Sequence, residues 1–166
     1  AGVWLRGSIA ADRVDLSGTL LTGITAIDGG AGNDSIIGSN GADTIVGGAG
    51  RDVLTGGLGA DVFVFKSANE GKLSAWDRIT DFTQGADVIN LVGMDANSLL
   101  AGRQGFGFIG DATFSHLAGE LRADTTIAGV VRVQGDVNGD GIADFELRLD
   151  IATGITAPMA AADFAI

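Results

Sequence analysis

The chain has 166 residues with ten basic and twenty-one acidic side chains, which give a formal net charge of −11. This length suits one domain or a repeat tract with a cap, and the negative charge argues against nucleic acid or an anionic membrane surface as a partner. The sequence contains no cysteine, which excludes disulfides and thiolate metal sites, and no apolar stretch is long enough for membrane insertion as a helix.

Residues 1–28 carry a weak version of the rhythm that follows them. Strand-like segments are expected at 14–16, 19–21 and 26–28, separated by Gly18 and Gly23. Because the terminal repeats of a solenoid are usually atypical, we interpret this stretch as metal-poor, degenerate N-terminal rungs. Trp4 is expected to be buried as a plug of that end.

Residues 29–64 consist of four contiguous nonapeptides, GGAGNDSII, GSNGADTIV, GGAGRDVLT and GGLGADVFV. Glycine recurs at places one and four, aspartate at place six and a large apolar residue at place eight. This repeat is typical of calcium-binding parallel β-rolls. Each unit is predicted to join a six-residue turn to a three-residue strand, whose eighth-place side chain is buried. Those side chains are Ile36, Ile45, Leu54 and Phe63.

The turns supply hard oxygen ligands, which calcium prefers in sets of six to eight. Two units complete one turn of a roll, so Asp34 and Asp52 should share one rim, and Asp43 and Asp61 the other. About three to five calcium ions are expected. Unit two departs from the consensus with Ser39, whose main contribution should be its carbonyl oxygen. The residues predicted to bind metal in these turns are Gly29, Gly30, Gly32, Asp34, Gly38, Gly41, Asp43, Gly47, Gly48, Gly50, Asp52, Gly56, Gly57, Gly59 and Asp61.

Residues 65–166 leave the nonapeptide period and are predicted to form an antiparallel, β-rich C-terminal cap. The predicted fold is therefore all-β, a right-handed parallel β-roll with two sheets and a cap. One short helix is expected to begin at Asp95 and to run through Leu99 and Leu100. The expected strands are 78–82, 88–92, 106–109, 120–123, 127–133, 145–149 and the final residues.

Two acidic segments in the cap are further candidate calcium sites. Asp136, Asn138, Asp140 and Asp144 stand at places one, three, five and nine of a loop similar to that of an EF-hand, although Leu147 replaces the usual glutamate at place twelve. The alternative is a type I′ Asn-Gly hairpin turn.

The second acidic segment is DRITDFTQGAD, residues 77–87. Asp77, Asp81 and Asp87 either ligate a calcium ion that closes the last rung or cap strand ends as solvated acids. Asp77 and Asp81 are included among the candidate ligands.

No catalytic residue is predicted. His116 is the only histidine, and the sequence lacks a G-x-S-x-G or H-E-x-x-H motif. A self-cleaving segment that uses an Asp-Pro bond is disfavoured, because Pro158, the only proline, follows Ala157.

The four nonapeptides resemble the RTX (repeats-in-toxin) tract, and the segments after them resemble the C-terminal domain of serralysin-type secreted proteases. The segments that carry this second resemblance are ADVFVF, DRITDF, GADVINLVGMDAN, GFGFIG, GELR, VQGDVNGDGIADFEL and ADFAI. The resemblance implies calcium binding and export from a Gram-negative cell by a type I ABC transporter. It also implies an uncleaved C-terminal secretion signal, which Asp163, Phe164, Ala165 and Ile166 fit. The protease half of that family is absent here.

The expected function is that of a non-catalytic module, secreted to the extracellular medium, that folds when it binds calcium. It would then stabilise an upstream domain of the same polypeptide. The alternative is a polysaccharide-binding module of the kind found in alginate epimerases or lyases. The scattered basic residues argue against that alternative for an anionic polymer.

Overall fold

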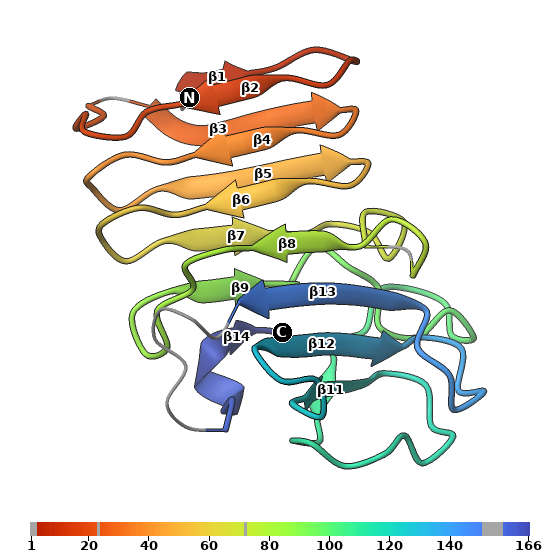
Figure 1. Ribbon diagram of the computed structural model, residues 1–166. Helices are drawn as coiled ribbons and strands as arrows, with labels where there is room; N and C mark the ends of the chain where they lie inside the picture. The colour runs from red at the N-terminus through yellow and green to blue at the C-terminus, as the bar shows by residue number, and fades with distance from the viewer. Residues whose placement is uncertain (1–2, 23, 72, 151–157) are drawn as a thin grey trace.

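The computed structural model describes residues 3–22, 24–71, 73–150 and 158–166. Its chain alternates between two stacked parallel sheets, which form a roll (Figure 1). The first sheet contains β1 (Val3–Arg6), β3 (Ile24–Ala31), β5 (Thr44–Ala49), β7 (Val62–Val64) and β9 (Val88–Asn90). The second contains β2 (Arg13–Asp15), β4 (Ser35–Ile37), β6 (Val53–Thr55) and β8 (Asp77–Ile79). The predicted all-β parallel roll is confirmed.

The core of the roll consists of two stacks of eighth-place side chains. Parallel pairing without slippage puts the same place of every unit above its equivalent, so Ile45 pairs with Phe63 and Ile36 with Leu54. All four eighth-place side chains have no exposed surface, as predicted. Alternation along each short strand turns the flanking residues outward, which explains why a three-residue strand is enough to anchor one rung.

The C-terminal region continues both sheets of the roll instead of forming a separate lid. β11 (Glu120–Asp124), β12 (Val130–Asp136) and β13 (Phe145–Asp150) pair in antiparallel fashion, and β13 pairs in parallel with β8. β10 (Gly107–Phe108) pairs in parallel with β11. A 3-10 helix (Ala161–Asp163) leads into β14 (Phe164–Ala165), which pairs in parallel with β9.

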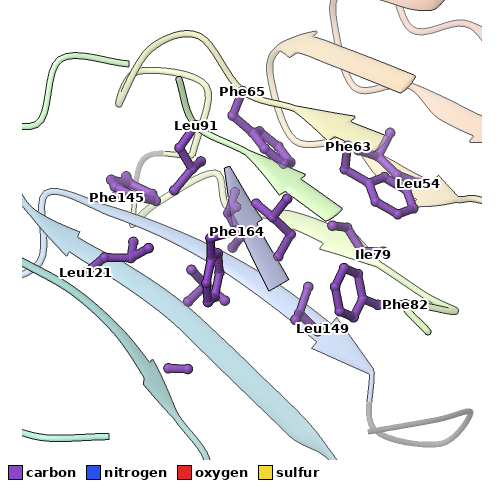
Figure 2. Close-up of a cluster of buried hydrophobic side chains, with 14 of the residues drawn as sticks. Leu54, Phe63, Phe65, Ile79, Phe82, Leu91, Leu121, Phe145, Leu149 and Phe164 are labelled. Carbon is purple, nitrogen blue, oxygen red and sulfur yellow. The ribbon is translucent and has the colours of Figure 1, made fainter. Parts of the chain in front are cut away.

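One apolar core therefore runs from the roll into the cap (Figure 2). Leu149 pairs with Ile79 in the second sheet, and Phe164 pairs with Ile89 in the first. The Phe164 ring lies 5.0 Å from the Phe108 ring, measured between centroids. β13 and β14 thus each add a strand to a stack that the nonapeptides began.

The N-terminal expectations were only partly correct. Strands form at β2 and β3, but residues 19–21 form no strand, and β1 was not expected. Trp4 is 45% exposed, so its assignment as a buried plug was wrong. The reason is the alternation of β1: Leu5, in register with Ile27, takes the inward place, and Trp4 turns outward beside Arg6 and Lys66.

The predicted helix at Asp95 does not form. Asp95 Oδ1 accepts hydrogen bonds from the N–H groups of Asn97 and Gln104, and Asn97 Oδ1 accepts one from Leu99 N–H. These local side-chain bonds satisfy the backbone in turns, where a helix would need continued i to i−4 bonding. Several predicted strands are also shorter or shifted, as the bounds of β8, β9, β10 and β12 show. No helix in the described ranges is long and apolar enough to cross a membrane.

The stacked core makes a direct prediction for Leu54, which is fully buried in β6. Leu54→Ala should lower the free energy of unfolding in saturating calcium by about 2–5 kcal/mol, because it opens a cavity in one stack. Val53→Ala is the matched control, since Val53 is the outward-facing neighbour and is 38% exposed. Urea denaturation measures both, and equal losses for the two variants would contradict the stacked arrangement.

Candidate metal centre

Two columns of aspartates run along the turns of the roll. On one rim the N–H of Asp34 donates to Asp52 Oδ1 at 2.8 Å, and the N–H of Asp52 donates to Asp77 Oδ1 at 2.7 Å. On the other rim Asp43 N–H donates to Asp61 Oδ1 at 2.8 Å. The predicted stacking of units one and three, and of units two and four, is therefore observed.

The second oxygens of one column lack partners. The Oδ2 atoms of Asp34, Asp52 and Asp77 are buried without a hydrogen bond, and these residues are at most 2% exposed. Burial raises the pKa of Asp77 to about 8 and the pKa of Asp52 to about 6. Since burying an unpaired carboxylate is costly, this column has the electrostatic character of a cation site.

The glycines leave room for oxygens to converge between stacked turns. A Cβ built on Gly29 would lie closer than 3.0 Å to both Asp34 Oδ2 and the carbonyl oxygen of Gly47. Gly48 has a φ of 100°, which favours glycine, and its missing Cβ would meet the carbonyl oxygen of Gly30. The turns therefore bring carboxylate and carbonyl oxygens into the same narrow space.

This set of donors fits calcium. Within the described residues, no three His, Cys, Asp or Glu side chains are grouped to hold a metal ion. An ion in the roll would therefore take two stacked carboxylates and complete its shell with backbone carbonyls. Calcium accepts six to eight such oxygens in loose geometry, whereas zinc requires nitrogen or sulfur ligands in a tight tetrahedron.

Residues 27–63 match the RTX calcium-binding nonapeptide repeat in four copies. These turns are RTX calcium-binding repeats. The chain is also similar to the metallopeptidase AprA of Pseudomonas marginalis, with 42% identity over 84 residues. That alignment spans 50% of this chain and only 16% of the metallopeptidase.

Two solved structures resemble the whole chain. The R2 subunit of AlgE6, a mannuronan C5-epimerase of Azotobacter vinelandii, has a TM-score of 0.65 and 27% identity, and the match covers 96% of this chain and 90% of that one. The R3 subunit of the same epimerase has a TM-score of 0.62 and 26% identity, and covers 95% and 79%. The protein is therefore a calcium-binding RTX repeat module related to parts of enzymes.

The RTX columns extend past the matched units. Asp77 follows Asp52 in its column, and Asp87 Oδ1 accepts the N–H of Asp61 at 2.9 Å. Asp81 lies elsewhere: its carboxylate accepts the N–H groups of Gly56 and Gly57.

Asp87 was left out of the predicted ligands, although its spacing could have found it. Residues 82–90, FTQGADVIN, keep glycine at place four, aspartate at place six and isoleucine at place eight.

The loop that begins at Asp136 is held together by its own side chains. Asp136 Oδ1 accepts from Gly139 N–H at 2.6 Å and Oδ2 from Gly141 N–H at 2.8 Å. Asp144 Oδ1 accepts from Asn138 Nδ2, and its Oδ2 from Val137 N–H. The type I′ alternative was wrong, since eight residues separate β12 from β13 and Asn138 does not have positive φ. Asp140 Oδ1 accepts from Ile142 N–H, and its carbonyl oxygen lies 2.8 Å from His116 Nδ1.

The predicted secretion-signal residues are packed into the end of the first sheet. Asp163 is 3% exposed, and its Oδ2 accepts from Ala160 N–H at 2.8 Å and from Gln84 Nε2 at 3.2 Å. Phe164 is buried, Ala165 completes β14, and Ile166 is 38% exposed.

A cavity of about 450 Å³ lies on the outer face of β11–β13, which the sequence did not suggest. Arg122, Arg132 and Arg148 line it together with Phe114 and Gln134. Because side chains alternate between the two faces of a strand, the sequence could place these arginines on the outer face. Only the pairing of β12 with β13 brings Arg132 beside Arg148.

The raised pKa values predict how the calcium-free chain responds to pH. A raised pKa means that the folded state binds more protons than the unfolded chain, so acid favours folding. The contribution of each raised pKa to the stability of the folded chain is complete below about pH 3.8. It is lost as the pH rises through about 6 for Asp52 and about 8 for Asp77. In calcium-free buffer, circular dichroism should show more β structure at pH 5 than at pH 8.

In saturating calcium the same comparison should reverse, because protons and calcium compete for the same carboxylates. Asp77→Asn removes one of the titrating groups and should flatten the calcium-free response between pH 6 and pH 8. A calcium-free chain that gains structure as the pH rises from 5 to 8 would contradict the assignment of these buried carboxyls.

Proposed function

We propose that the chain is a non-catalytic module whose folding is switched on by calcium, and which stabilises an upstream domain of a secreted protein. The observation that carries the proposal is the column of buried carboxylates at Asp34, Asp52 and Asp77, each with an unpartnered Oδ2. Folding without cations would bury several negative charges in one line. Calcium bound to the folded state alone removes that penalty and stabilises the roll by mass action.

The proposed ligands are the turn residues predicted from the repeat. The carboxylates of Asp34, Asp43, Asp52 and Asp61 supply charge, and carbonyl oxygens of the glycine turns complete each shell. Asp77 and Asp87 extend the two columns, and Asp81 orients the backbone of the last glycine turn.

The loop Asp136–Asp144 is proposed as a separate calcium loop, whose side chains turn toward the ion when it binds. In the structure most of those carboxylate oxygens accept hydrogen bonds from the loop itself.

Export through a type I ABC transporter before folding fits the position of the C-terminus. In the folded chain Asp163 and Phe164 are buried, so a transporter must read this signal while the chain is unfolded. Cytosolic calcium is too scarce to fill sites of the extracellular class, for which dissociation constants are roughly 0.1–1 mM. The chain would thus stay competent for export inside a Gram-negative cell and fold outside it.

Calcium titration into calcium-stripped protein tests this function. At pH 7.5 the stripped chain should lack β structure by circular dichroism and should fold cooperatively at roughly 0.1–1 mM calcium. Asp52→Asn should raise the calcium concentration for half-folding about tenfold or more, because Asp52 belongs to a buried column. Asp111→Asn, an exposed site outside the roll, is the control. A fully folded stripped chain that takes up no calcium would contradict the proposal.

A second candidate function is binding of an acidic polysaccharide, and the arginine-lined cavity is what favours it. Asp124 forms ion pairs with Arg122 and Arg132, and Glu146 forms one with Arg148. Three guanidinium groups against two carboxylates leave one positive charge in excess, in a chain that is otherwise strongly acidic. The related solved structures belong to a mannuronan C5-epimerase, so a uronate polymer is the natural ligand class.

Beside the cavity, Arg148 extends this cationic surface over an aromatic ring. Its guanidinium lies 3.8 Å from the centroid of the Trp76 ring, and that of Arg51 lies 4.0 Å from the same centroid. Stacking on the Trp76 ring holds these guanidinium groups in place, and planar guanidinium groups bind carboxylates through paired hydrogen bonds.

Titration with a mannuronate tetramer in saturating calcium separates this candidate from the first. Arg148→Gln should weaken binding about tenfold, because it removes one charge from the cavity. Arg103→Gln, an exposed arginine outside the cavity, should leave binding unchanged. Equal binding of a neutral mannose tetramer, or no binding, would overturn the second candidate without touching the first.

A further inference from the structure

One turn outside the matched segment has the geometry of an RTX calcium turn. Residues 7–15, GSIAADRVD, keep glycine at place one, aspartate at place six and an apolar residue at place eight. They lie before the matched range of 27–63. Their strand, β2, stacks on β4 at the N-terminal end of the roll (Figure 1), and Val14 is in register with Ile36.

The backbone bonds of this turn continue the aspartate column by one step. Asp12 N–H donates to Asp34 Oδ1 at 2.8 Å, the distance at which Asp34 N–H donates to Asp52 Oδ1. The N–H of Ser35 donates to the Asp12 carbonyl at 2.9 Å, as that of Val53 donates to the Asp34 carbonyl at 2.8 Å. Asp12 therefore occupies the position that Asp34 and Asp52 occupy in the matched units.

The gap between units one and three defines what an RTX site of this chain contains. Asp34 Oδ2 and the Gly47 carbonyl oxygen both crowd the point where a Cβ on Gly29 would stand. The carbonyl oxygens of Gly30 and Gly32 crowd the equivalent points on glycines of the following turn. With the Oδ1 atom of the next aspartate, five oxygens face one gap.

The gap before unit one contains the five equivalent oxygens, one turn earlier in the roll. Asp12 Oδ2 and the Gly29 carbonyl oxygen crowd the point where a Cβ on Gly7 would stand. The carbonyl oxygens of Ser8 and Ala10 crowd the glycines of the following turn. Asp34 Oδ1 is the fifth oxygen, so the correspondence holds atom by atom.

Serine at place two does not spoil the turn, because unit two has the same substitution. Ser8 N–H donates to Asp12 Oδ2 at 2.6 Å, and Ser39 N–H donates to Asp43 Oδ2 at 2.5 Å. In both turns the serine Oγ accepts a hydrogen bond from the N–H two residues later, at 3.1 Å. Unit two lies inside the segment that matches the calcium-binding repeat.

The charge at this gap is not balanced by a protein cation. Asp34, whose Oδ1 faces this gap, is 2% exposed, and its Oδ2, which faces the next gap, has no hydrogen-bond partner. Within the described residues, neither Asp12 nor Asp34 forms an ion pair with a Lys or Arg side chain. A bound divalent cation supplies that balance without rearranging the turn.

We propose that a calcium ion binds between the turn Gly7–Asp12 and the turn Gly29–Asp34. The inference rests on the proposed calcium-dependent folding, and it moves the first metal site into a stretch expected to be metal-poor. Asp12 and Asp34 supply the carboxylates, and the carbonyl oxygens of Ser8, Ala10 and Gly29 supply neutral ligands. The ion fastens β1 and β2 to the matched repeats. Because Ser8 and Ala10 are exposed, this site exchanges with solvent more readily than the buried sites.

Native mass spectrometry in saturating calcium counts the ions in the intact chain. Asp12→Asn should bind one ion fewer than the natural chain, whereas the exposed control Asp111→Asn should bind the same number. Residue-specific amide NMR should show that residues 7–12 of Asp12→Asn no longer respond to calcium, while residues 38–61 still do. An unchanged ion count in Asp12→Asn would overturn the site.

Ser8→Ala separates loss of the ligand from loss of the turn. It removes the hydroxyl bonds but keeps the Asp12 carboxylate and every carbonyl oxygen. This variant should keep the full ion count, and loss of an ion from it would overturn the assignment to the carboxylate. A natural chain that binds no calcium at all would instead overturn the proposed function, which makes the two failures distinguishable.

Discussion

The rest of the structure depends on one electrostatic constraint, the stacking of carboxylates in register along the rims of the roll. Parallel pairing puts Asp34, Asp52 and Asp77 directly above one another, and the N–H of each one donates to the next. The same bonds that order the turns therefore bring negative charges together in a buried line. Among the described residues, no Lys or Arg side chain forms an ion pair with this column, which is why we propose that bound cations supply the positive charge.

Parallel register also explains why the C-terminal region belongs to the roll. Each rung leaves two strand edges open, and an open edge is a site for further pairing. At the C-terminal end β13 covers β8 and β14 covers β9, so both edges are used by the same chain. The antiparallel strands β11 and β12 then extend the second sheet, whose outer face carries the arginine cavity. The last residues therefore complete the same two sheets that the repeats begin.

Where sequence reasoning failed, local chemistry overrode a weak pattern. Asp95 and Asn97 favoured turns through their own side chains, although aspartate before an apolar run also suits a helix start. Trp4 was expected inside because it is large and apolar, but strand alternation gave the inward place to Leu5. The sequence left the role of Asp87 open and did not single out the turn at Asp12, because their units lack most of the glycines and the stacking that identifies them is a tertiary relation.

The sequence by itself determined the period of the roll, the inward stack and the calcium chemistry. Its repeat fixes which place faces inward and which carries a carboxylate, because each unit folds in the same local way. Only the tertiary structure decided how far the columns extend, where the chain ends pack and which arginines meet. Those features depend on the register between segments far apart in the chain, such as Arg148 with Arg132 or Phe164 with Ile89. No local pattern encodes that register, since it follows from which edges remain open once the repeats have stacked.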